Sequence, residues 1–166
     1  MKNIILSLFL AMTVSACSSG SSVADTPFNI TGVFNGTFVS NTNDNTRSSG
    51  EFTLNIAEDD AGNVSGNIIF ANAGGNVDNS CVFSGLVEGS TSGFSVAIDA
   101  TVPGGTTVTV DDEDGNPMEV DISGAQINYQ LTQSNNGNTL TGTFVSQNLA
   151  RCSNFSGSGT VDINRR

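Results

Sequence analysis

The 166-residue chain carries 16 acidic and five basic residues, a formal net charge of −11, and contains neither histidine nor tryptophan. The negative charge repels phosphate backbones and no cationic stripe offsets it, which excludes nucleic acid as a partner. Without histidine, a serine or cysteine nucleophile lacks its usual base, so we expect a protein that is not an enzyme.

The first 17 residues have the order of charge, apolar run and small residues that is typical of a secretion signal. Lys2 gives a positive start, and the apolar stretch from Ile4 to Val14 is too short to span a bilayer. The residues Val14-Ser15-Ala16-Cys17 resemble the lipobox of bacterial lipoproteins, in which the cysteine is acylated and begins the mature chain. The resemblance implies a signal peptide over residues 1–16 and lipidation of Cys17. The alternative is a buried strand followed by a free cysteine.

Residues 17–29 are expected to form a lipidated flexible tether, because Ser18 to Thr26 are rich in serine, glycine and alanine. Ser18 directly after the cysteine resembles lipoproteins that are sent on to the outer membrane. We therefore expect a cell-envelope protein that meets a membrane through its N-terminal lipid, with the outer membrane as its site. Removal of Lys2 with the signal leaves a formal charge of −12.

From Ile30 onward, apolar residues fall on every second position, which is the period of half-buried antiparallel strands, and helical spacing is nowhere sustained. Pro103-Gly104-Gly105 is expected to be a kink or a bulge, and Ser123-Gly124 a bulge, each within one long run. Eight strands are predicted, over residues 30–40, 51–56, 64–70, 81–87, 94–110, 118–132, 139–146 and 155–164.

An even number of sequential strands with one apolar face predicts an all-β domain over residues 30–166. It would be a single eight-stranded antiparallel up-and-down barrel, which leaves no edge exposed. A β-sandwich is the alternative. The outer positions carry serine, threonine, asparagine and aspartate without an aromatic girdle, which favours an apolar interior over a membrane-spanning barrel.

Two further cysteines, Cys81 and Cys152, would lie in an oxidising compartment after export. Both precede even-numbered strands, so a barrel brings them to the same rim, where one disulfide can join them. Closing this loop would stabilise the fold by roughly 4 kcal/mol in the chain-entropy model. A metal-binding or catalytic pair of thiolates is the alternative, but the chain has no Cys-x-x-Cys spacing and no histidine. We expect no metal and no cofactor.

The C-terminal third resembles small uncharacterised bacterial lipoproteins with a β-barrel, lipocalin-like domain. Leu140 to Val145, Cys152 and Ser156 to Ile163 carry this resemblance, which implies the barrel but no activity. Lipocalin-like barrels share the architecture, but their Gly-x-Trp strand opening is absent, because the chain has no tryptophan.

The barrel interior is expected to interleave aromatic rings with glycines, which subtract volume and leave room for a small apolar ligand. The alternative is that the glycines allow curvature and close packing, so that the domain is a filled scaffold for another envelope protein. In both cases the predicted function is non-catalytic binding or scaffolding. The candidate ligand-lining residues are Phe34, Phe38, Phe70, Phe94, Tyr129, Phe144 and Phe155.

Two acidic patterns invite other functions. The turn from Asp111 to Asn116 has calcium-type oxygen ligands, but the standard loop would start at Val110 and end at Asp121, so a solvated hairpin tip is expected. A carboxylate-dependent hydrolase is a minor alternative, although no spacing selects a facing pair. The carboxylates considered for it are Glu51, Glu58, Asp99 and Asp121.

Overall fold

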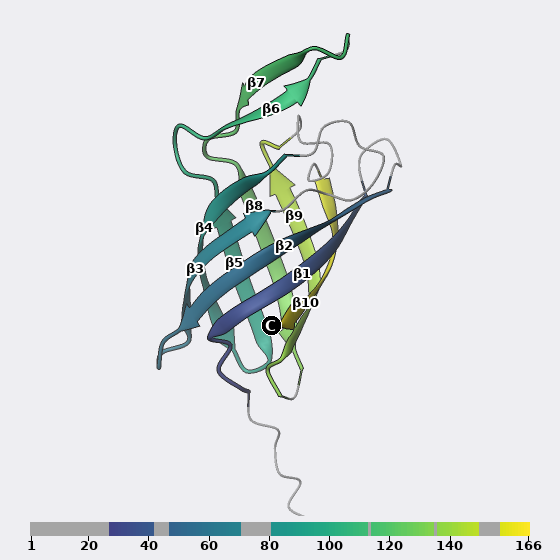
Figure 1. Ribbon diagram of the computed structural model, residues 1–166. Helices are drawn as coiled ribbons and strands as arrows, with labels where there is room; N and C mark the ends of the chain where they lie inside the picture. Colours follow the sequence, from purple (N-terminus) through teal and green to yellow (C-terminus); the bar gives the residue numbers. More distant parts are fainter. Residues whose placement is uncertain (1–26, 42–46, 71–80, 113, 135, 150–156) are drawn as a thin grey trace, which may run out of the picture.

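The computed structural model describes residues 27–41, 47–70, 81–112, 114–134, 136–149 and 157–166, and they hold ten β-strands and no helix. Eight of the strands form a closed barrel, and β6 and β7 form a separate hairpin beyond one end of it (Figure 1). The strands are β1 Gly32–Asn41, β2 Arg47–Glu58, β3 Asn63–Phe70, β4 Phe83–Ser92, β5 Ser95–Thr101, β6 Thr107–Asp111, β7 Pro117–Asp121, β8 Gln126–Gln133, β9 Thr139–Gln147 and β10 Gly157–Arg165.

The barrel order is β1-β10-β9-β8-β5-β4-β3-β2, and all neighbouring strands are antiparallel. Each strand therefore pairs with the next barrel strand along the chain, and the first and last strands close the ring. The closing register runs from Phe34 opposite Arg165 to Asn41 opposite Ser158. The predicted eight-stranded up-and-down barrel is confirmed, and the sandwich alternative is wrong because the sheet has no open edge.

The predicted bulges in the fifth and sixth runs are wrong. β5 ends at Thr101 and β8 begins at Gln126, and the chain between them leaves the barrel wall to form the β6–β7 hairpin. Gly105 and Gly124 have φ values of +79° and +73°, so each makes a turn where a bulge was expected. The neck of the hairpin is held by backbone hydrogen bonds from Val102 to Ala125 and from Gly124 to Val102, both of 2.9 Å.

Alternation along the strands sends apolar side chains inward and polar ones outward. β8 illustrates the period, because Ile127, Tyr129 and Leu131 are buried while Gln126 and Gln130 are exposed. The buried side chains of the barrel strands belong to one continuous core. This burial is the main stabilising contribution to the fold.

The two ends of the barrel differ. The first described residues, from Pro27, and the C-terminal Arg166 lie at the same end, which we call the terminal end. The β6–β7 hairpin projects from the opposite end, which we call the hairpin end (Figure 1). The signal peptide, Cys17 and most of the tether lie outside the described residues.

The predicted disulfide concerns the hairpin end. β4 and β10 both begin there, which agrees with the expectation that Cys81 and Cys152 precede strands starting at one rim. Cys81 is buried, with an exposed fraction of 0%. Cys152 lies outside the described residues, so the pairing stays a prediction.

Candidate functional site

Aromatic rings form a connected chain across the barrel interior. The centroid distances are 4.6 Å between Phe83 and Phe70, 5.6 Å between Phe70 and Phe52, and 6.1 Å between Phe52 and Tyr129. Tyr129 continues to Phe144 at 6.2 Å, and Phe144 meets Phe38 edge-on at 6.0 Å. Such offset and edge-to-face contacts are the favourable geometries for ring pairs. Burial raises the pKa of the Tyr129 hydroxyl well above its usual value.

Most of the candidate ligand-lining residues face this interior. Phe34, Phe38, Phe70, Tyr129 and Phe144 are buried, with exposed fractions of 3% or less. Phe94 was wrongly placed in the interior. It lies in the two-residue turn between β4 and β5 and is partly exposed, because β4 runs on to Ser92. Phe155 lies outside the described residues.

Around Phe52 and Tyr129, the inward side chains leave too little space for a ligand. One internal void offers about 0 Å³ to a water-sized sphere. A void of this kind is a packing defect, because even a single water needs roughly 10–15 Å³. Its lining residues are Phe52, Leu54, Ile68, Ile98, Tyr129, Leu131 and Ile163.

The inward glycines are filled by their neighbours. A methyl group added at Gly36 would lie 2.2 Å from Cζ of Phe52, so this ring occupies the space that the glycine leaves. At Gly159 the methyl group would lie 2.1 Å from the backbone oxygen of Val39 and 2.6 Å from Cε1 of Phe144. The glycines thus bring strands and rings close together, as the filled-scaffold alternative expects. At Gly36 and Gly159, the space that the glycine leaves is therefore not free for a ligand.

Arg165 closes the terminal end of the barrel from inside. Its side chain follows the inward register of β10, and the guanidinium carbon lies 4.8 Å from the centroid of the Phe34 ring. Nη1 donates to the backbone oxygen of Thr31 at 2.6 Å, and Nη2 donates to those of Asn29 and Gly137, both at 3.2 Å. Nε is buried and has no hydrogen-bond partner in the described residues.

The segment before β1 crosses the terminal end and is fixed by two further side chains. Glu58 accepts hydrogen bonds from the backbone N–H of Ile30 at 2.8 Å and from the Thr91 hydroxyl. Gln133, which is only 4% exposed, accepts from the N–H of Phe28 at 3.0 Å. Ile30 itself is fully buried. This end is therefore closed by contacts that sequence reasoning missed.

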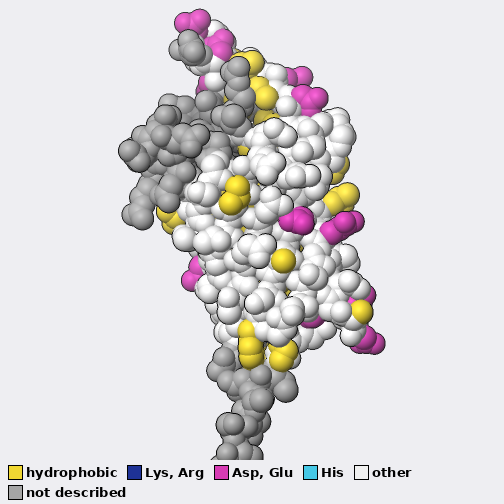
Figure 2. Space-filling view, turned by 180° about the vertical axis from the view of Figure 1, so that it is seen from behind, with side chains coloured by type: hydrophobic (Ala, Val, Ile, Leu, Met, Phe, Trp, Pro, Cys, Tyr) yellow, Lys and Arg dark blue, Asp and Glu magenta, His cyan; other side chains and the backbone are white. Residues whose placement is uncertain are grey.

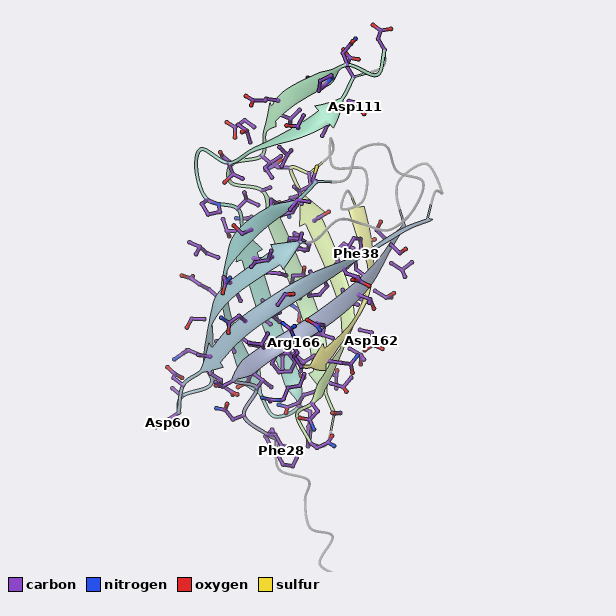
Figure 3. The ribbon with its side chains drawn as sticks, viewed as in Figure 1. Phe28, Phe38, Asp60, Asp111, Asp162 and Arg166 are labelled. Carbon is purple, nitrogen blue, oxygen red and sulfur yellow. The ribbon has the colours of Figure 1, made fainter. Side chains whose placement is uncertain are left out.

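A groove runs over the outer faces of β2, β1 and β10 and has a volume of about 350 Å³. The register places Thr37 between Glu51 and Asp162 in one row. The next row places Asn35 between Thr53 and Asn164. Figure 3 shows Asp162 on the outside of the barrel wall. The groove residues are Asn35, Gly36, Thr37, Glu51, Phe52, Thr53, Asp162 and Asn164.

Hydrogen bonds fix one side of the groove. Asn164 Nδ2 donates to Asp162 Oδ1 at 2.9 Å, and Asn164 Oδ1 accepts from the Thr139 hydroxyl at 3.0 Å. The Asp162 carboxylate is therefore oriented before any ligand arrives. On the other side, the side chain of Glu51 makes no hydrogen bond to the described residues.

The four carboxylates considered for hydrolysis are not brought together. Glu51 and Asp99 lie on outer faces of β2 and β5, which two other strands separate. Asp99 accepts from Asn128 at 2.6 Å, Glu58 belongs to the terminal end, and Asp121 accepts from the N–H of Ser123 at 2.8 Å. The structure offers this alternative no facing pair among them.

The acidic hairpin tip is organised by its own hydrogen bonds. Asp112 Oδ1 accepts from the N–H of Asn116 at 2.8 Å and from that of Asp114 at 2.9 Å. These bonds, above all the one from Asn116, hold the pKa of Asp112 below its usual value. Across the described residues, no three His, Cys, Asp or Glu side chains are grouped to hold a metal ion.

The remaining outer surface is mostly uncharged and polar. Figure 2, which views the barrel from behind, shows scattered carboxylates and small separate apolar groups. Ile69 of β3, Val82 just before β4 and Leu86 of β4 are 47%, 59% and 60% exposed.

Comparison with family models gave no match, and neither curated proteins nor solved structures match the chain. In the described residues, no helix is long and apolar enough to cross a membrane.

Proposed function

We propose that the protein is a lipid-anchored, non-catalytic binding module of the cell envelope that engages its partner through the outside of the barrel. The filled interior then serves as a rigid core. The observation that carries this proposal is the absence of room for even one water in the internal void. An apolar ligand inside would have to displace the packed rings around Phe52 and Tyr129.

The arrangement of the chain ends supports the anchor. A lipid on Cys17 would hold the barrel by its terminal end, because the segment before β1 lies there, with Phe28 labelled in Figure 3. The terminal end would then face the membrane, and the barrel wall and the hairpin end would face away from it. The hydrogen bonds of Arg165 and Glu58 to residues 29–31 would fix the end of the tether to the rigid barrel.

Photo-crosslinking in cells tests the binding role. We would place the crosslinker on three outer faces, at Thr37 of β1, Thr101 of β5 and Thr143 of β9. The proposal expects one envelope component to be captured from one face and not from the other two. Equal capture from all faces, or capture from none, would contradict it.

The anchor has a separate test. A palmitate analogue supplied to the cells should label the full chain, and Cys17→Ser should abolish the label and release the protein from membranes. A labelled Cys17→Ser variant would show that the lipid is elsewhere or that the anchor is wrong.

A further inference from the structure

The groove over β2, β1 and β10 carries the furthest inference. Its volume of about 350 Å³ lies in the range of small-molecule sites, which is roughly 300–1,000 Å³. Unlike the internal void, it admits water-sized groups. Polar outward side chains of three adjacent strands line it together with Gly36 and Phe52, so it is a surface of the sheet and is not formed by a loop.

The chemistry of the groove is rich in acceptors. Glu51 and Asp162 each carry a carboxylate, and neither forms an ion pair in the described part of the chain. Asn164 already uses its amide group on Asp162 and its oxygen on Thr139. Carboxylates can only accept hydrogen bonds when ionised, so the ligand must bring N–H or O–H donors.

Charge narrows the class of ligand. An anion would meet two carboxylates and a chain with a net charge of −11, so it is repelled. Arg166, which is exposed, follows the end of β10 and does not line the groove. A positively charged donor gains both the hydrogen bonds and the electrostatic attraction.

The distance between the two carboxylates narrows the class of ligand further. Glu51 and Asp162 flank Thr37 on opposite sides, so their strands are separated by two inter-strand steps of about 4.8 Å each. A ligand that satisfies both carboxylates therefore has two donor groups joined by a short extended linker.

We propose that this groove binds a linear cation with two primary ammonium groups, one on Glu51 and one on the pre-oriented Asp162. The linker and the remaining N–H groups of the two ammonium groups would contact Thr37, Asn35 and Thr53. The inference rests on the proposed function, because it names the ligand class and the outer face that the binding module uses.

Calorimetric titration of the full-length protein in detergent with 1,5-diaminopentane, at low ionic strength, tests the inference. Two exposed ion pairs predict weak, salt-sensitive binding that Glu51→Gln with Asp162→Asn lowers about tenfold. The neutral analogue 1,5-pentanediol should bind at least about tenfold more weakly than the diamine.

A charge-matched control separates the groove from the general negative field. Glu88 and Asp99 face each other on the outside of β4 and β5, and neither lines the groove. Glu88→Gln with Asp99→Asn removes the same charge and should change the affinity less than about twofold. An equal loss in both double variants, or no loss in the groove variant, would overturn the inference.

A second arm distinguishes a free diamine from lysine side chains of a protein partner. A short peptide with two lysines two residues apart is titrated beside the diamine, and the groove variant should weaken both. Tighter binding of the peptide would assign the ammonium groups to a protein partner. If neither cation binds while crosslinks still form from one outer face, the proposed function stands and this inference fails.

Discussion

Arg165 and Phe34 are register partners across the closing pair of strands, and the guanidinium carbon of Arg165 lies 4.8 Å from the centroid of the Phe34 ring. The same guanidinium donates to three backbone carbonyls at the terminal end. One side chain therefore joins the last strand, the first strand and the segment that enters the barrel. Its planar shape suits both the stacking and the divergent hydrogen bonds.

Replacing Arg165 should loosen this end. Arg165→Ala leaves three carbonyls without their donor and removes the cover of the Phe34 ring, so we expect the free energy of unfolding to fall by about 2–3 kcal/mol. Arg165→Lys keeps the charge but not the planar guanidinium with its several N–H donors, so it should recover less than half of the lost free energy of unfolding. Urea denaturation measures both. Wild-type stability of the alanine variant would contradict the assigned role.

Gly36→Ala tests the packing of the interior. The added methyl group would lie 2.2 Å from Cζ of Phe52, and overpacking of this kind costs about 1–3 kcal/mol. Phe52→Leu in the same chain should offset part of the loss, because it removes the clashing ring. Gly104→Ala is the control, since no atom lies within 4 Å of the added group. Equal thermal shifts for the two alanine variants would count against a filled interior.

Phe144→Ala should open a cavity. Phe144 is 2% exposed and contacts both Phe38 and Tyr129, so its truncation is expected to cost about 3–5 kcal/mol. The variant should also bind benzene, and the wild type should not, because an apolar cavity can stay dry and take an apolar guest. The neighbouring Val145, which is 50% exposed, gives the control Val145→Ala with little change. NMR titration reads the binding, and benzene uptake by the wild type would be the adverse result.

Acid should weaken the turn between β2 and β3. The hydrogen bonds from the Asn63 side chain and backbone hold the pKa of Asp59 below its usual value of 3.8. A carboxylate with a lowered folded-state pKa stabilises the fold above its unfolded-state pKa, and this stabilisation is lost as the pH falls through the folded-state value. We expect the melting temperature to drop below about pH 4, and Asp59→Asn to flatten that drop. An unchanged acid slope in the variant would exclude this turn as a cause.

The predicted disulfide can be checked through its thiols. Cys81 is buried and β4 and β10 start at the same end of the barrel, so pairing with Cys152 requires no change of topology. Neither cysteine should react with maleimide in denaturant without a reductant, and reduction should lower the stability by about 2–5 kcal/mol. Labelling of both residues before reduction would refute the bond.

The barrel was predictable because alternation with a period of two is maintained through every barrel strand. The same alternation misled at the hairpin, since Val108 and Val110 continue the inward pattern although β6 lies outside the barrel wall. The turns at Gly105 and Gly124 direct the chain out of the barrel wall. The sequence alone does not distinguish a glycine that makes a turn from one that makes a bulge. Phe94 was misplaced for the same reason. It lies two positions before the inward-facing Val96, so alternation predicted an inward side chain, but the turn begins at Gly93.

The sites were harder to predict than the fold. Arg165 falls two residues after the inward Ile163, so alternation indicated an inward side chain. The sequence did not indicate which backbone carbonyls its guanidinium would bind. The groove depends on the closure of β10 onto β1, which places Asp162 beside Thr37 across 125 positions of sequence. No local pattern reports such a neighbour. The free volume of the interior likewise depends on which ring enters which glycine gap.

Native mass spectrometry of the full-length protein, delipidated, refolded and incubated with extracted envelope lipids, tests the central claim that the barrel is filled and binds from outside. We predict a mass equal to the polypeptide with its covalent lipid and no retained apolar molecule. A stoichiometric apolar ligand that survives transfer into the gas phase would contradict the claim.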